Sequence, residues 1–269
     1  MWKIGAVSSL KLDAAALSCA GPNHHPDLQV ATNCMDISDC SKPARVTFPS
    51  SNIHRTIAGH ICNLRCNRGS FTHTGTMAAP TQVTIRDLNG TWRMSKTLSD
   101  DLGPSLALQG MPWILRKAVS YATITGKLSQ TQDDKGITSI AIQQTASGGI
   151  KGEDEKHKLD GAENIHGSLM FGAQHVRSSW LDVKTTNPLS LSGEPLDPYL
   201  LQGWLDEEQP GQPGHITVNV INERAGWKAD QVWGFSNIDG QRYRIAKFLV
   251  SKGEEIAPVR VVYEWVGRE

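Results

Sequence analysis

Four polar residues in the second half of the chain could donate a hydrogen bond to a substrate carbonyl: Gln144, Lys151, Tyr243 and Tyr263. A fixed donor aimed at a carbonyl oxygen stabilises the negative charge that develops there during an addition. Each residue also has a structural interpretation, because a lysine on a half-exposed strand usually faces solvent and a tyrosine can bond across a sheet. We treat these four residues as the candidate catalytic groups.

Five aromatic residues could form the walls of a site for a flat, conjugated molecule: Trp113, Tyr121, Trp180, Trp233 and Phe235. Aromatic faces stack on such molecules, although a tryptophan is more often a core residue than a ligand platform. A site of apolar walls and a few donors can bring two reactants together without a nucleophile, a metal or a redox cofactor. The expected partner is therefore a hydrophobic small molecule, and no cofactor or metal is predicted.

The sequence lacks the motifs of several other enzyme classes. There is no G-x-S-x-G, no P-loop and no G-x-G-x-x-G after a strand. The acidic groups Asp100-Asp101 and Glu153–Glu155 are explained by a helix cap and a turn. A haem-binding barrel would need an axial histidine, and four are available among polar residues where we expect them to face water: His157, His166, His175 and His215.

The first 76 residues differ from the rest of the chain. All five cysteines precede Met77, and the segment is rich in Ser, Asn, Pro and Thr without sustained periodicity. Such composition does not bury enough apolar area to offset the entropy of ordering. We expect residues 1–76 to be disordered and residues 77–269 to be the functional unit, since Met77-Ala78-Ala79-Pro80 resembles a translation start. A cluster with zinc-binding residue types lies in this segment, but reduced thiols in an unstructured region are the alternative: His54, His60, Cys62 and Cys66.

Charge and hydropathy limit the partners and the location. The 27 Lys and Arg residues balance the 27 Asp and Glu residues, so no global field favours nucleic acid. No apolar run is long enough to cross a bilayer, and Lys11 and Asp13 interrupt the apolar core that a signal peptide needs. We expect a cytoplasmic protein, and the sequence does not indicate its oligomeric state.

Helical spacing follows a short strand near residue 90. Residues 91–98 form a strand-like run, Ser99-Asp100-Asp101 offer capping side chains, and Pro104 fits a first helical turn. Apolar residues from Leu106 to Tyr121 then recur at helical intervals. The pattern predicts a short helical pair after the first strand.

Strand-like segments follow at hairpin spacing, at 122–132, 137–146, 150–159, 167–183, 216–224, 229–237, 241–251 and 259–266. Asp239-Gly240 is a strong hairpin signal. Eight to ten antiparallel strands predict an all-β fold, closed into a barrel, which removes unpaired edges. Residues 185–214 are dense in proline and glycine and read as a long loop; Tyr199-Leu200-Leu201 and Trp204 make it a candidate lid, with simple disorder as the alternative.

The segment from Gly90 resembles the calycins, the lipocalin and fatty-acid-binding barrels. Gly90-Thr91-Trp92 matches their first-strand G-x-W, whose tryptophan closes one end of the barrel, and residues 110–117 are similar to their portal helices. Fatty-acid-binding proteins anchor a carboxylate with an arginine two residues before a tyrosine of the last strand. That position here is Val261, with Arg260 one residue away, so the sequence departs from this pattern before Tyr263.

A closer resemblance is to a fungal lipocalin-like family, through GTW, KTLSDD, LALQG, LRKA, QTASGGIKG, ADQVWGF and VRVVYEWVG, which span most of residues 89–267. The family includes proteins similar to the hetero-Diels–Alderases of tropolone–sesquiterpene biosynthesis. The resemblance implies a cofactor-free pericyclase of secondary metabolism that joins a quinone methide to a terpene such as humulene. The alternative is a non-catalytic carrier of a lipid or pathway intermediate.

Overall fold

The computed structural model describes residues 78–184, 187–207 and 212–268. The predictions for residues 1–76, including the cysteine and histidine cluster, lie outside these ranges. Three helices occur in the described part: α1 Gly103–Leu108, α2 Trp113–Tyr121 and α3 Pro198–Leu201. Its strands are β1 Gly90–Met94, β2 Ile124–Gln132, β3 Thr138–Ala146, β4 Ile150–Lys151, β5 Glu155–Lys158, β6 Glu163–Ser168, β7 Gly172–Leu181, β8 His215–Asn222, β9 Trp227–Ile238, β10 Gln241–Lys252 and β11 Glu255–Gly267.

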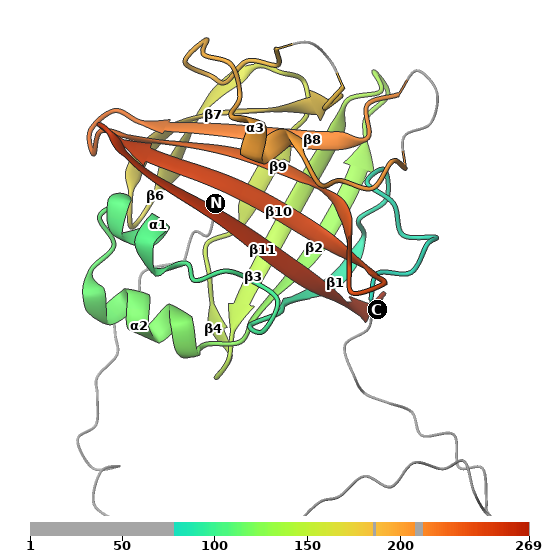
Figure 1. Cartoon of the computed structure of the whole chain (residues 1–269), viewed down its shortest axis with the longest axis horizontal. Coiled ribbons are helices and arrows are strands. Elements are labelled where there is room, and N and C mark those ends of the chain that lie inside the picture. Colours follow the sequence, from blue (N-terminus) through green and yellow to red (C-terminus); the bar gives the residue numbers. More distant parts are fainter. Residues whose placement is uncertain (1–77, 185–186, 208–211, 269) are drawn as a thin grey trace, which may run out of the picture. The chain divides into compact units, whose positions relative to one another are not determined.

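The strands form one antiparallel sheet that curves around a common core (Figure 1). Its order is β4-β3-β2-β1-β11-β10-β9-β8-β7-β6, and β5 pairs with β3. The predicted all-β class is confirmed. Full closure is not, because no strand ladder in the described ranges joins β5 to β6 or β7; isolated bonds cross that gap, such as Gly161 N to Ser178 O at 3.0 Å.

The helical pair lies where it was predicted, at one end of the sheet (Figure 1). α1 has Pro104 in its first turn, as expected. The capping residues act differently from the prediction, since only Asp101 bonds the helix start, accepting from Gly103 N at 2.9 Å. Ser99 Oγ accepts from Val262 N at 2.9 Å and Asp100 Oδ2 from Arg260 N at 2.8 Å. Ser99 and Asp100 therefore bond the segment that precedes α1 to strand β11.

The strand predictions hold for the long strands and fail for the short ones. The segment 150–159 divides into β4 and β5, and the predicted strand 167–183 contains β7 but only the last two residues of β6. Neither the sequence EDEK at 153–156 nor the polar stretch 163–168 has alternating apolar residues. The pattern therefore does not indicate β5 or β6 as separate strands. At the β9–β10 hairpin, Asp239 and Gly240 have φ of 50° and 79°, which fits a type I′ turn.

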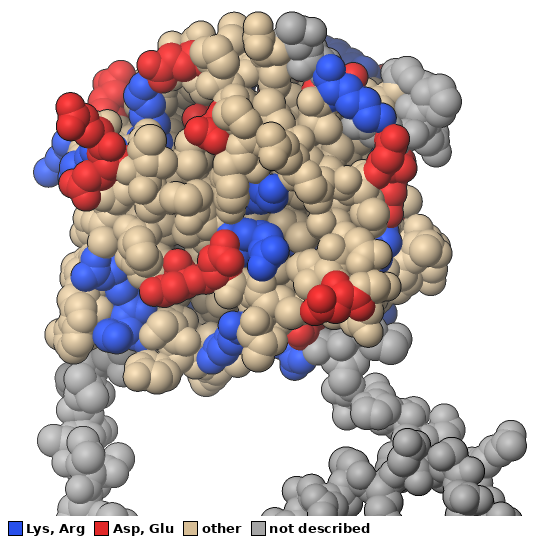
Figure 2. All heavy atoms as spheres, in the orientation of Figure 1, with Lys and Arg blue, Asp and Glu red and all other residues tan. Residues whose placement is uncertain are grey.

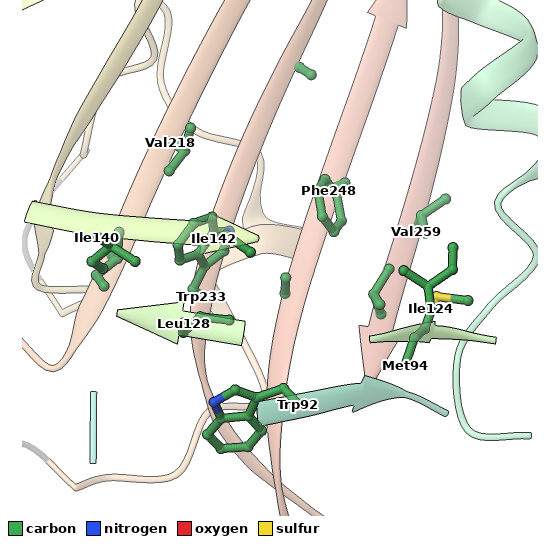
Figure 3. Packing of buried hydrophobic residues seen from close by; sticks show 14 of the residues in the cluster. Trp92, Met94, Ile124, Leu128, Ile140, Ile142, Val218, Trp233, Phe248 and Val259 are labelled. Atoms are coloured by element: carbon green, nitrogen blue, oxygen red, sulfur yellow. The ribbon is translucent and has the colours of Figure 1, made fainter. Parts of the chain in front are cut away.

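Alternation along the strands builds the interior. On β9 the odd-numbered positions from Trp227 to Phe235 are buried, and Trp233 and Phe235 belong to the main core. Trp92 is fully buried, donates its indole N–H to Leu88 O at 3.0 Å and meets the Trp265 ring edge-on with centroids 4.7 Å apart. Figure 3 shows Trp92 and Trp233 directed into the space between the strands. Trp92 therefore fills one end of the interior.

The long loop has an ordered apolar island, but it covers the outside of the sheet. Leu200 is fully buried in a cluster with Leu181, Leu196 and Val232. Val232 points away from the interior, because its neighbours Gln231 and Trp233 point inward. Lys247 of β10 holds this segment against the sheet by donating hydrogen bonds to Tyr199 O at 3.0 Å and Gln202 O at 2.6 Å. The lid prediction is wrong for the island, which braces β9 and β10 instead.

Acidic and basic side chains are interspersed on the face shown in Figure 2, without a large region of one sign. No helix in the described ranges has both the length and the apolar character that a bilayer-spanning segment needs.

Candidate functional site

The outer cavity is an apolar hollow of about 240 Å³ at the helical end of the sheet. α2 forms one wall with Leu115, Val119 and Tyr121, and the β3–β4 hairpin forms another with Ala146 and Ile150. α2 closes over this space because its single fully buried apolar residue, Val119, faces the strands, whereas Trp113 and Ile114 point outward. The volume approaches that of small-ligand sites, about 300–1,000 Å³.

A second, inner cavity shares the residue Gln144 with the outer one. It measures about 30 Å³, so it holds one small group rather than a whole ligand. Its walls combine Trp92 and Trp233 with polar residues of five strands: Gln144, Glu155, Gln231, Arg244 and Tyr263. The interior at this level is therefore filled largely by side chains, and the outer cavity offers more space than the inner one.

Arg244 places a positive charge at the inner cavity. The residue is 2% exposed, on the face of β10 that also carries Ala246 and Phe248. Its guanidinium carbon lies 4.4 Å from the ring centroid of Tyr263 and 5.4 Å from that of Trp233, distances at which a cation is attracted to an aromatic face. Burial lowers the pKa of Arg244, and Tyr263 and Glu155 oppose that shift. An arginine nevertheless keeps its charge in proteins.

Glu155 lies in the same cavity and is 4% exposed. Gln144 Nε2 donates to Glu155 Oε1 at 2.7 Å, and His157 Nε2 lies 3.4 Å from Glu155 Oε2. His157 Nδ1 lies 3.0 Å from Ser178 Oγ. A chain of polar contacts thus runs from Gln144 through Glu155 and His157 to β7. It fixes the carboxylate and one donor of Gln144.

Tyr263 completes the inner cavity from β11. Burial raises the pKa of its hydroxyl to about 12, although the Arg244 charge works in the opposite direction. The phenol therefore stays protonated at neutral pH. Val261, two residues earlier, is fully buried, and Arg260 donates its Nη2 to Leu98 O at 3.3 Å outside the interior. The arginine that enters the interior comes from β10 instead.

Comparison with known proteins identifies the relatives of this chain. Pericyclase pydY from Acremonium sp. is 31% identical over 194 residues, which are 71% of this chain and 98% of pydY. The chain belongs to the same family as pericyclase pydY. Probable pericyclase scpY from Mollisia scopiformis is 29% identical over 191 residues, covering 71% of this chain and 95% of scpY. No protein-family model matches the chain.

Solved structures with similarity to this pericyclase-family chain include lipid-binding proteins. Apo lipid binding protein 8 of Caenorhabditis elegans has a TM-score of 0.40 and 12% identity, covering 68% of this chain and 97% of that one. A Schistosoma mansoni fatty acid binding protein in complex with arachidonic acid has a TM-score of 0.39 and 12% identity, covering 66% and 96%.

Five of the nine candidate residues lie at the two cavities of this pericyclase-family chain. Gln144 is at their junction, Trp233 and Tyr263 line the inner cavity, and Tyr121 and Lys151 line the outer one. Tyr121 is 79% exposed, and Lys151 is also exposed, so both lie on the rim. Whether these residues act on a substrate stays a prediction.

The other four candidates lie elsewhere. Tyr243 is wrong as a cavity residue, because it faces the opposite side of β10, packs with Ile245 and Val262, and donates to Gln241 Oε1 at 2.6 Å. Trp113 is 62% exposed on the outer side of α2. Phe235 is buried beneath the Arg242 guanidinium, 3.6 Å from its ring centroid, and Trp180 is similarly covered by Arg86 at 3.7 Å. Neither borders the two cavities.

Sequence reasoning missed Arg244 and Glu155, and misplaced two histidines. His157 and His215 are 6% and 2% exposed rather than facing water. The available signal for Arg244 was its position on the alternating face with Ala246, Phe248 and Val250, where a charge is unexpected. Glu155 and His157 gave no such signal, since β5 reads as a uniformly polar segment.

Proposed function

We propose that this protein is a cofactor-free pericyclase that carries out an intermolecular hetero-Diels–Alder reaction, joining a quinone methide to a terpene such as humulene. The observation that carries the proposal is an apolar outer cavity that shares Gln144 with a small inner cavity lined in part by polar groups. Membership of a family whose named relatives are pericyclases supports the reaction class. A cycloaddition redistributes electrons within the reactants, so it requires no external oxidant or reductant.

The two cavities suit reactants of unequal polarity. In this reaction the methylene carbon and the carbonyl oxygen of the quinone methide each bond to one carbon of a terpene double bond. With the carbonyl oxygen at the edge of the inner cavity, a donor there can bond one lone pair of the oxygen while the terpene, a hydrocarbon, approaches the oxygen and the methylene carbon from the outer cavity beneath α2. Holding reactants in such geometry accounts for up to about 7–11 kcal/mol of a reaction barrier.

Gln144 has the central role in this arrangement. One of its amide hydrogens bonds Glu155, which fixes the side chain and leaves the second hydrogen for a substrate oxygen at the junction. Tyr263 offers a protonated hydroxyl group, and Trp233 supplies an aromatic wall. Lys151 lies on the exposed rim, where it can guide an oxygen-bearing substrate but polarise it only weakly.

The decisive assay incubates the protein with a tropolone quinone-methide precursor and humulene, and follows adduct formation and stereochemistry against a protein-free reaction. A pericyclase raises the rate and selects one stereoisomer. A carrier protein binds one reactant, detected by quenching of tryptophan fluorescence, while the rate and product distribution stay those of the protein-free control. That second result would refute the catalytic proposal.

Two neighbouring glutamines provide a matched pair of variants. Gln144→Met removes the junction donor, and we expect a fall in the cycloaddition rate of about 10-fold, the scale of one hydrogen bond to a developing charge. Gln143→Met changes the next residue of β3, which is exposed on the other face. Equal rates in the two variants would remove Gln144 from the mechanism.

A further inference from the structure

Arg244 is a buried cation whose hydrogen-bonding capacity is not fully used. Its Nε atom is buried, and no acceptor within the described ranges bonds to it. Burying an arginine among tryptophan and tyrosine rings costs free energy unless acceptors replace the lost water. An unsatisfied donor of this kind in the wall of a cavity indicates a group that binds an incoming acceptor.

The carboxylate in the same cavity is oriented by other residues. Glu155 receives the Gln144 amide on one oxygen, and its other oxygen lies beside His157. The negative charge of Glu155 raises the pKa of Arg244 and so favours the charged guanidinium. The cavity is therefore close to electrically balanced before a ligand enters, with a positive side at Arg244 and a negative side at Glu155.

We propose that Arg244 binds a neutral, conjugated carbonyl oxygen of the substrate from the inner cavity and polarises it for reaction with a terpene held in the outer cavity. This inference rests on the proposed function and deepens it by naming the catalytic cation and the substrate class. A carbonyl oxygen fits a space of about 30 Å³, whereas a whole ring does not. The guanidinium bonds one lone pair of the oxygen and withdraws electron density from the conjugated system, which lowers the barrier to cycloaddition, while the other lone pair forms the new C–O bond to the terpene.

The charge balance decides between a carbonyl group and a carboxylate as the occupant. A carboxylate would lie beside Glu155 in a confined, poorly solvated space, and two like charges there repel strongly. A neutral carbonyl accepts from the guanidinium without that repulsion. The inner cavity therefore selects ketones, aldehydes and quinone methides over acids.

Binding of three probes of one shape tests this selection: benzylideneacetone, a conjugated ketone; cinnamate, the corresponding acid; and trans-β-methylstyrene, a hydrocarbon. Trp92 and Trp233 flank the cavity, so quenching of tryptophan fluorescence reports occupancy. We expect the ketone to bind more tightly than cinnamate, and its carbonyl stretching frequency to fall on binding. Arg244→Met should weaken ketone binding about 10- to 100-fold, the scale of a charged hydrogen bond, and leave hydrocarbon binding unchanged.

Two further variants separate this role from a structural one. Arg244→Lys keeps the charge and should retain part of the frequency shift, while Arg93→Met removes an arginine whose ion pair with Glu264 lies outside the cavities and should change nothing. Thermal unfolding of each variant establishes that it is folded; if Arg244→Met is not, Arg244→Lys and Arg244→Gln supply the same comparison. Tighter binding of cinnamate, or equal losses for ketone and hydrocarbon, would overturn the inference.

These binding measurements are independent of the proposed reaction. If the ketone binds through Arg244 while the quinone methide and humulene do not react faster, the oxygen site stands and the cycloaddition fails. If cycloaddition is accelerated equally by wild type and Arg244→Met, the reaction stands and the role of Arg244 fails.

Discussion

The two adjoining cavities differ in almost every physical respect. The outer cavity is about eight times larger, is walled by apolar side chains and opens beneath α2. The inner cavity holds about one small group, and its wall includes five polar side chains beside two tryptophans and other apolar residues. Gln144 belongs to both. One cavity therefore provides apolar contact area, and the other provides orientation and charge.

This difference shows how an all-β sheet can combine binding with catalysis. Apolar walls gather a hydrocarbon substrate without directing it, whereas fixed donors in a dry site act on one atom. The inner cavity depends on tightly packed residues, so changes there affect stability as well as function. The outer cavity depends on residues at the rim, so changes there should affect binding alone.

Trp92→Ala should have the largest effect. The side chain is fully buried, donates to Leu88 and contacts the Trp265 ring, so its removal enlarges the inner cavity and leaves Leu88 O without that donor. We expect the free energy of unfolding to fall by about 3–5 kcal/mol, measured by urea denaturation. Tyr121→Ala, in the wall of the outer cavity but 79% exposed, should change stability by less than about 0.5 kcal/mol. Similar losses of unfolding free energy in Trp92→Ala and Tyr121→Ala would show that the two cavity walls contribute equally to stability.

Alkaline pH should weaken the protein through Tyr263. Burial raises the folded-state pKa of this phenol to about 12, above the unfolded value near 10. Between these values the unfolded chain loses its proton first, so the free energy of unfolding falls as pH rises and is unaffected below about pH 9. The loss should approach about 2–3 kcal/mol, at about 1.4 kcal/mol per pKa unit.

The control for this effect is a phenylalanine substitution. Tyr263→Phe removes the titrating hydroxyl of the inner cavity and should flatten part of the alkaline decline in a series of denaturation curves. Tyr199→Phe should flatten another part, because burial on the outer face of the sheet also raises its pKa to about 12. If the dependence of unfolding free energy on pH is unchanged in Tyr263→Phe, the Tyr263 hydroxyl has the same pKa in the folded and unfolded states.

Much of the fold follows from local patterns that the sequence displays. The predicted segments 137–146 and 229–237 correspond to β3 and β9, and Asp239-Gly240 forms the predicted turn between β9 and β10. Pro104 and the helical spacing up to Tyr121 located α1 and α2. These signals are short-ranged, because neighbouring residues alone determine the faces of a strand and the first turn of a helix.

The site was less predictable because it depends on contacts between distant strands. Glu155 and Arg244 lie on β5 and β10, and their approach follows from the curvature of the sheet rather than from spacing along the chain. Tyr243 illustrates the converse error, since a residue chosen for its hydroxyl lies one position from the correct face. A one-residue difference on a strand reverses the side to which the group points.

Ala146→Phe should weaken ligand binding in the outer cavity while leaving the stability of the protein almost unchanged. Ala146 is a half-buried residue in the wall of the outer cavity, and a phenyl ring there occupies space that a ligand needs. We expect affinity for trans-β-methylstyrene to fall at least about 10-fold, equivalent to about 1.4 kcal/mol, with the free energy of unfolding changed by less than about 1 kcal/mol. Gln143→Phe, on the exposed face of the same strand, is the control. Undiminished binding in Ala146→Phe would place the ligand elsewhere.

Lys151→Met should have the smallest effect and tests the rim directly. The side chain is exposed, so its charge acts through water, where a unit charge 4 Å away contributes only about 1 kcal/mol, and less in salt. We expect the cycloaddition rate to change less than about twofold, whereas Arg244→Met, at a 2% exposed position, should slow it far more. Rates measured at low and high salt would separate the two groups, because screening reaches the rim and not the interior. If Lys151→Met slowed the reaction as much as Arg244→Met, the oxygen would be polarised at the rim, and the inner cavity would have no part in catalysis.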